Sequence, residues 1–160
     1  MFVLGIDPGL SVTGYGLVEG THPPRASRAG VIRTEIDSTT PERLAELYEA
    51  LTQVIADCSP DVVALETVFT NRNLQTANSV GRASGVALLA AARSGLPVFE
   101  YVPTAVKSAI TGDGSANKRQ VQQMVARLLH LETAPKPADA SDALAIALCH
   151  LRVAPVRAAR

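Results

Sequence analysis

The sequence predicts a single α/β domain, built on a five-stranded mixed sheet flanked by helices. Two observations predict this class. Three strand-like segments come first, and helical and strand-like segments alternate after them. The first segment, FVLGI at residues 2–6, is continuously apolar, which is typical of a strand buried on both faces inside a sheet. The 160 residues, 47% of them apolar, are enough for one domain with its own core.

The first three strands are expected to form an antiparallel meander with the first strand inside the sheet. After residues 2–6, a turn containing two glycines leads to YGLVEG, which begins at Tyr15. The third strand is AGVIRTEI, which begins at Ala29. The segment between them, THPPRAS at 21–27, carries two prolines and is predicted to be a loop.

The clearest helix covers residues 41–57. Thr40 can cap it, Pro41 suits the first helical position, and Ser59-Pro60 stops it. The apolar residues recur at helical spacing and form one stripe, namely Leu44, Leu47, Tyr48, Leu51, Val54 and Ile55. This stripe predicts a helix that packs on one face of the sheet.

Helices and strands alternate over the rest of the chain. The expected order is a strand in DVVALE, a helix from about 74 to 93, a strand in PVFEY, a helix from about 104 to 110, a glycine-rich loop, a helix near 117–131 and a helix at about 139–152. Residues 1–160 are therefore expected to form one domain, with 153–160 as a flexible tail.

The net charge of zero, from 15 basic and 15 acidic residues, does not exclude a nucleic-acid partner. If four acids were gathered in one metal site, the remaining 15 basic and 11 acidic residues would leave +4 for the rest of the surface. Cys58 and Cys149 are far apart and lack metal-ligand spacing, which favours reduced thiols in a cytoplasmic protein. No apolar run reaches membrane-span length, and the first residues do not resemble a signal peptide.

Four carboxylates are the strongest functional signal. Asp7 and Glu66 each end an apolar strand, and the carboxyl ends of neighbouring parallel strands face one crevice. Asp139 and Asp142 are three residues apart, so they share one face of the last helix. Simpler roles remain open, because Asp-Pro-Gly is good turn chemistry and Asp139 can be a helix N-cap.

The last helix is rich in alanine, so its start can approach the sheet closely. Four acids brought together there would repel one another without a counter-ion. Hard divalent cations with oxygen ligands are the natural remedy. The pattern therefore favours a metal site at the sheet edge over four unrelated surface acids.

The motifs GIDPGLSVTGYGLV, VALETVF and ADASDALAIALCH resemble those of the RuvC Holliday-junction resolvases, as do PVFEYVPTAVK and GSANKRQVQQMV. The resemblance runs in order over residues 1–151 and implies a ribonuclease H-like fold. It also implies a homodimeric endonuclease that resolves four-way DNA junctions in recombination and repair. Paired symmetric nicks would leave 5′-phosphate and 3′-hydroxyl ends. Its expected cofactor is Mg²⁺, two ions per site with Mn²⁺ as a substitute, and its expected partners include the RuvA and RuvB branch-migration proteins.

By motif position, the resemblance makes the metal ligands Asp7, Glu66, Asp139 and Asp142. It makes Lys107 and Lys118 phosphate or transition-state contacts, although a solvated surface lysine is the simpler alternative for each. The remaining expected DNA contacts are Phe69, which would stack on opened bases, and Arg72, Arg82 and Arg119, which would meet backbone phosphates. A place in the core is the alternative for Phe69, and a solvated surface position is the alternative for Arg72 and Arg82.

Three other patterns carry predictions. Asp113 lies between glycines and is expected to serve a turn, and the three histidines form no ligand cluster. Ala77, Gly81 and Gly85 recur every four residues on the predicted helix at 74–93, so another element can approach this face closely. That element is either the protein's own sheet or a second subunit.

Three rival functions remain. An aspartate before a glycine-containing hairpin also opens actin-like phosphotransferases, but those need two large lobes and a second phosphate loop. An RNA-processing nuclease on the same fold is a nearer rival. A junction-binding protein without cleavage is disfavoured because all four acids are present.

Overall fold

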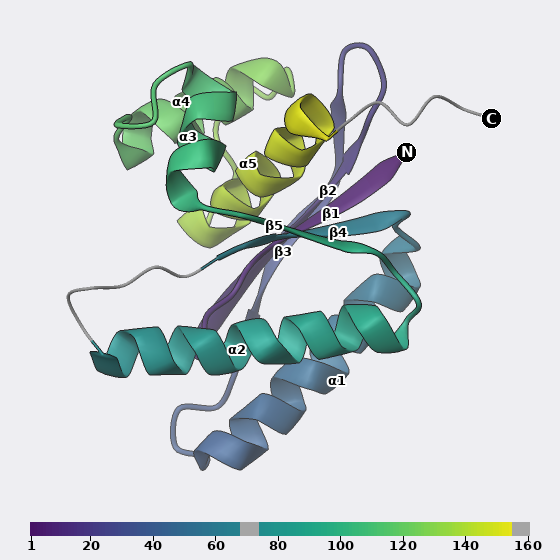
Figure 1. Ribbon diagram of the computed structural model, residues 1–160, viewed down its shortest axis with the longest axis vertical. Helices are drawn as coiled ribbons and strands as arrows, with labels where there is room; N and C mark the ends of the chain where they lie inside the picture. The colour runs from purple at the N-terminus through teal and green to yellow at the C-terminus, as the bar shows by residue number, and fades with distance from the viewer. Residues whose placement is uncertain (68–73, 155–160) are drawn as a thin grey trace.

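The computed structural model describes residues 1–67 and 74–154 (Figure 1). Its centre is a five-stranded sheet in the order β3-β2-β1-β4-β5. The strands are β1 (Phe2–Asp7), β2 (Val12–Glu19), β3 (Arg25–Arg33), β4 (Val62–Glu66) and β5 (Val98–Tyr101). β1 pairs antiparallel with β2 and parallel with β4, so the predicted mixed sheet and the inner position of the first strand are confirmed.

Helices cover both faces of the sheet (Figure 1). One face carries α1 (Thr40–Cys58) and α2 (Leu74–Arg93), and the other carries α3 (Pro103–Thr111), α4 (Lys118–Leu128) and α5 (Ala138–Val153). Each face has its own apolar core, because successive strand residues point to opposite sides. In β1, for example, Val3 packs toward α5 and Leu4 packs toward α1.

The close approach predicted for the last helix is confirmed. A Cβ on Gly5 of β1 would overlap the backbone of Ala143, and a Cβ on Gly16 of β2 would lie 2.8 Å from the side chain of Leu144. Ala143 and Ala147 of α5 are fully buried against this glycine-lined surface. Glycine on the strands and alanine on the helix thus place α5 directly on the centre of the sheet.

The β2–β3 hairpin is longer than predicted. β2 begins at Val12 instead of Tyr15, and β3 begins at Arg25 instead of Ala29. Pairing continues to Glu19 opposite Arg25, past a register shift between Leu17 and Val18. The residues at the end of the expected loop therefore pair in an exposed part of the sheet. No apolar alternation in the sequence marks this part as a strand.

The ends of the helices also differ from the expectation. The N-cap of α1 is Thr39 and not Thr40, because the Glu42 carboxylate accepts hydrogen bonds from the Thr39 amide at 2.8 Å and from its hydroxyl at 2.7 Å. α4 ends at Leu128, three residues early, and His130 then adopts a left-handed conformation with φ of 53°. α5 extends to Val153, so the expected tail begins later; residues 155–160 lie outside those described.

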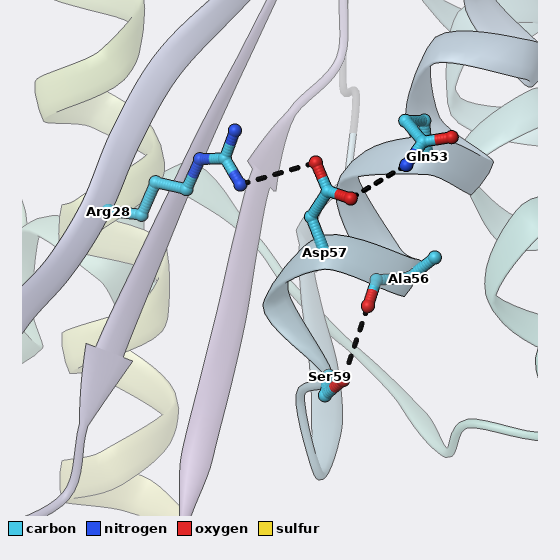
Figure 2. A network of polar contacts seen from close by, with 5 residues as sticks. All are labelled: Arg28, Gln53, Ala56, Asp57 and Ser59. Atoms are coloured by element: carbon cyan, nitrogen blue, oxygen red, sulfur yellow. Dashed lines mark hydrogen bonds and ion pairs between the residues drawn. The ribbon is translucent and has the colours of Figure 1, made fainter.

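The last turn of α1 is tied to β3 by a polar network (Figure 2). Arg28 donates to the Asp57 carboxylate at 3.4 Å, and Gln53 donates to the other oxygen of that carboxylate at 2.6 Å. Both partners of the ion pair are exposed, so solvent screens it and its contribution to stability is small.

Two further expectations concern cysteines and membranes. Cys58 and Cys149 are both free thiols, as predicted. Across residues 1–67 and 74–154, no helix combines the length and the apolar character needed to cross a membrane.

Candidate active site

Asp7 and Glu66 lie side by side at one edge of the sheet. β1 and β4 are parallel and Ile6 pairs with Leu65, so the next residue of each strand is the acid that ends it. The side chains of Ile6 and Leu65 pack toward α1 and α2. Because side chains alternate along a strand, both carboxylates point to the opposite face, which α5 covers.

α5 brings the other two acids to the same edge. Gly14 pairs with Asp7 across the β1–β2 ladder, and a Cβ on Gly14 would overlap the backbone of Asp139. The first turn of α5 therefore rests on the strand partner of Asp7. Asp142 follows one turn later and lines a pocket together with Glu66. The alternative N-cap role of Asp139 is wrong, because the N-cap is Pro137 and Asp139 is inside the first turn.

Burial and the charges of neighbouring acids raise the pKa values of Asp7, Glu66 and Asp142. Burial raises the pKa of Asp7 to about 7, with further contributions from the charges of Glu66, Asp142 and Asp139. Burial and the charge of Asp142 raise the pKa of Glu66 to about 7. Burial also raises the pKa of Asp142, although Lys118 opposes this shift. The four acids thus form one electrostatic cluster, a pattern typical of functional sites.

Two lysines border the cluster. Lys107 of α3 and Lys118 of α4 line the same pocket of about 260 Å³ as Glu66 and Asp142. Lys118 Nζ lies 2.6 Å from Asp142 Oδ2, and this contact raises the lysine pKa. Lys107 and Lys118 therefore lie beside two of the acids. Their roles toward DNA stay predictions.

The donor set has the chemistry of a site for hard cations. Carboxylate oxygens are the ligands that Mg²⁺ and Ca²⁺ prefer, and these carboxylates already influence one another's protonation. As they stand, however, no three acidic, histidine or cysteine residues within 1–67 and 74–154 are arranged closely enough to hold a metal ion. Asp142 directs one oxygen to Lys118.

The backbone beside each strand-end acid is fixed by contacts that the sequence pattern did not reveal. After Asp7, the buried Thr13 hydroxyl donates to the Gly9 carbonyl at 2.7 Å and accepts from the Gly9 amide at 3.2 Å. After Glu66, the Thr67 amide donates to the Tyr101 carbonyl at 2.9 Å. A threonine shortly after a glycine turn was the one available signal for the first contact.

The other predicted residues are distributed as follows. Arg119 is exposed next to Lys118, whereas Arg82 lies on α2, which covers the other face of the sheet. Phe69 and Arg72 lie outside the described residues. Asp113 serves a turn, as predicted: its carboxylate accepts from the Ser115 amide at 2.8 Å and from its hydroxyl at 2.7 Å.

Gly81 and Gly85 of α2 do not face the protein's own sheet. A Cβ on Gly81 or Gly85 would meet nothing within 4 Å. The buried face of α2 is instead formed by alanines, namely Ala83, Ala87, Ala90 and Ala91. The own-sheet alternative is therefore wrong for Gly81 and Gly85. The second-subunit alternative stays a prediction.

The chain is similar to known proteins over nearly its whole length. Residues 3–150 match the family model described as crossover junction endodeoxyribonuclease RuvC. The protein of that name from Chloroflexus aggregans is 49% identical over 156 residues, which are 97% of this chain and 95% of the relative. The one from Salinispora arenicola is 50% identical over 153 residues, which are 94% of this chain and 87% of the relative.

Solved structures of Holliday junction resolvases are also similar to this chain. Thermus thermophilus RuvC in complex with a Holliday junction substrate matches with a TM-score of 0.88 and 38% identity, covering 95% of this chain and 93% of that one. The yeast mitochondrial Holliday junction resolvase Ydc2 matches with a TM-score of 0.66 over 94% of this chain and 78% of its own. At 14% identity, the yeast protein shares the fold alone.

Proposed function

Because this chain belongs to the RuvC family of crossover junction endodeoxyribonucleases, we propose that its four clustered acids are the metal ligands of a junction-resolving site. The chain is an endodeoxyribonuclease that resolves Holliday junctions in recombination and repair. The proposed ligands are Asp7, Glu66, Asp139 and Asp142, and the proposed cofactor is Mg²⁺, two ions per site with Mn²⁺ as a substitute.

The observation that carries the ligand assignment is that Asp7 and Glu66 directly follow the paired residues Ile6 and Leu65 at the ends of neighbouring parallel strands. Their raised pKa values and the charges of the two α5 acids support it. When bound, the divalent ions supply Lewis acidity that activates water and stabilises the leaving 3′ oxygen. The products are a 5′-phosphate and a 3′-hydroxyl, which a ligase can rejoin.

We assign a separate role to each side chain around the acid cluster. Lys107 and Lys118 meet the oxygens of the scissile phosphate, because both ammonium groups border the acid pocket. Arg119 lies beside Lys118 at the start of α4 and binds a neighbouring phosphate. Phe69 is assigned to stacking on opened bases, and Arg72 and Arg82 to the DNA backbone.

The assembly is also part of the proposal. A C₂ homodimer would supply two equivalent sites for symmetric nicks, and the exposed face of α2 around Gly81 and Gly85 is a candidate for part of its interface. RuvA and RuvB are the proposed branch-migration partners. We place the protein in the cytoplasm, where free Cys58 and Cys149 would stay reduced.

A substrate comparison tests this function. The protein is incubated with a synthetic four-way junction, a linear duplex of the same sequence, a folded RNA and ATP, each with and without Mg²⁺. We expect Mg²⁺-dependent paired nicks in the junction, sealable by DNA ligase, and no ATP hydrolysis. Preferential cleavage of the RNA, or hydrolysis of ATP, would favour a rival function.

A further inference from the structure

A polar groove lies beside the sheet edge that carries the four acids, on the sheet face covered by α1 and α2. It has a volume of about 590 Å³ and is bordered by the β1–β2 turn, the start of α1 and the first half of α2. The residues that matter here are Leu10, Ser11, Arg43, Asn78, Ser79 and Arg82. Among the described residues, the lining of this groove includes two arginines and no acidic side chain. By contrast, the pocket at the acid cluster contains two acids with its two lysines.

Arg43 is held rigidly by neutral oxygens. Its Nε donates to Thr34 Oγ1 at 3.0 Å, and its Nη2 donates to Ser11 Oγ at 2.8 Å. Thr34 in turn donates from its hydroxyl to the Leu10 carbonyl at 2.6 Å. This network connects α1 to the turn that follows Asp7. It uses two of the five guanidinium N–H donors of Arg43, which also lines the groove, and the other three have no hydrogen-bond partner among the described residues.

The positive charge of the groove has no acidic partner. Within residues 1–67 and 74–154, neither Arg43 nor Arg82 takes part in an ion pair. The hydroxyl and amide side chains of Ser79 and Asn78 add neutral hydrogen-bonding groups. Unpaired arginines among neutral polar groups match the donor pattern of a phosphate contact, because a guanidinium offers parallel N–H donors to two phosphate oxygens.

We propose that this groove binds a backbone phosphate of a junction arm, with Arg43 and Arg82 as its two cationic contacts. The inference rests on the proposed function and extends it to the opposite face of the sheet. Only the turn of residues 8–11 separates the groove from Asp7 in the chain, so a DNA strand at the acids can continue across this turn. Because Arg43 is already fixed by Thr34 and Ser11, little side-chain entropy is lost when it binds phosphate.

The test measures junction affinity against salt concentration, in EDTA so that no cleavage occurs. Arg43→Gln and Arg82→Gln are each expected to weaken binding by about 3- to 10-fold and to reduce the slope of log K against log salt by about 1. Arg43→Lys keeps the charge but loses the planar fork, so its affinity should fall between those of Arg43→Gln and the wild type.

Arg28→Gln is the matched control. It removes the same charge from a surface arginine that pairs with Asp57 (Figure 2), outside the groove, and should leave the salt slope unchanged. Arg82→Gln is not expected to disturb folding, because Arg82 makes no hydrogen bond or ion pair within the described residues. Thermal unfolding verifies that each variant is folded.

The outcomes separate the two proposals. If the wild type binds the junction and the groove variants keep its slope, the phosphate site is wrong. The site is also wrong if Arg82→Gln shifts the sedimentation of the free protein and leaves DNA affinity unchanged, because the groove would then contact another copy of the chain. If the wild type itself does not prefer the junction to a linear duplex, the proposed function fails instead.

Discussion

The ammonium nitrogen of Lys118 lies 2.6 Å from a carboxylate oxygen of Asp142, so the first residue of α4 pairs with an acid one turn into α5. A cation at a helix N-terminus is disfavoured by the helix dipole, by about 0.3–1 kcal/mol, and Asp142 offsets this cost. The same carboxylate is a proposed metal ligand. Lys118 and a divalent ion must therefore compete for Asp142.

This competition predicts the effect of Lys118→Met on metal affinity. Without the ammonium group, Asp142 is free to turn toward the other acids, and one repulsive charge near the ion is removed. We expect Mn²⁺ to bind the DNA-free protein more tightly by about three- to tenfold, as for a partly exposed pair worth about 1 kcal/mol. Titration followed by electron paramagnetic resonance measures this directly.

Lys107→Met provides the matched control. Lys107 borders the same pocket, but no ion pair of Lys107 occurs within residues 1–67 and 74–154. Its loss should therefore change Mn²⁺ affinity less than the loss of Lys118. Equal affinities for the wild type and Lys118→Met would contradict the competition. In both variants cleavage should slow, because each loses a proposed phosphate contact.

Asp7→Asn tests the ligand assignment itself. The amide keeps the shape of the side chain and loses the charge that holds a divalent ion. We expect junction cleavage in Mg²⁺ to fall by about 10³-fold or more, since metal ions supply several kcal/mol of transition-state stabilisation. Junction binding in EDTA should persist, because lysine and arginine contacts to phosphates supply most of the affinity. Appreciable Mg²⁺-dependent nicking by this variant would remove Asp7 from the ligands.

The raised pKa values of Asp7 and Glu66 predict that stability without metal decreases with pH. Both acids ionise near pH 4 in the unfolded chain and near pH 7 in the folded one. Between these values the folded state binds more protons, so the free energy of unfolding falls as pH rises through this window. His150 has the opposite effect, because burial lowers its pKa. Comparing the pH dependence of the unfolding free energy between the wild type and one variant therefore isolates the acid better than the wild-type curve alone.

Asp7→Asn should remove much of this dependence. In EDTA, Asp7 of the folded protein is protonated at pH 5 and ionised at pH 8, whereas Asp7 of the unfolded chain is ionised at both pH values. The stability of the variant relative to the wild type should therefore increase by about 2 kcal/mol or more from pH 5 to pH 8, since each pKa unit corresponds to about 1.4 kcal/mol. Urea unfolding at both pH values measures the difference. If the variant does not become more stable relative to the wild type between pH 5 and pH 8, the pKa of Asp7 is not raised in the folded protein.

The sequence was sufficient to predict that the four acids lie near one another, because each acid has a recognisable position on its own strand or helix. Asp7 and Glu66 each end a strong apolar strand, and Asp139 and Asp142 share one helix face, so a parallel pairing of β1 with β4 and a thin α5 bring them together. The contacts of Lys118 and Arg43 could not be predicted in this way. Lys118 meets an acid 24 residues later, and Arg43 meets a serine 32 residues earlier. Such pairs depend on how separate elements are placed, which periodicity does not encode.

The errors at element ends have a similar origin. Thr39 and Thr40 are both acceptable caps, and only the position of the Glu42 carboxylate decides between them. The first residues of β3 carry no apolar alternation, because they pair at an exposed part of the ladder. Tertiary contacts therefore determine these boundaries.

Gly5→Ala tests the close packing of α5. A methyl group at this position would overlap the Ala143 backbone, which is not free to move because α5 lies directly on the sheet. We expect a loss of about 1–3 kcal/mol or more in the free energy of unfolding. Gly85→Ala is the control: its new methyl group meets open space on a helix, so a gain of about 0.5–1 kcal/mol is expected. An unaffected Gly5→Ala protein would contradict the observed contact.

Gly81→Leu tests the proposed dimer. A resolvase must nick two strands of like polarity at symmetric points, and a C₂ homodimer supplies both sites from one surface patch. Since a Cβ at Gly81 meets nothing within 4 Å in the single chain, the variant should fold with unchanged or slightly higher stability. If a partner packs closely on this face, the bulky leucine should prevent association. The variant should then sediment as a folded monomer and produce single nicks in place of paired ones, whereas Gly81→Ala should stay largely dimeric. A Gly81→Leu protein that remains dimeric and nicks in pairs would place the interface elsewhere on the molecule.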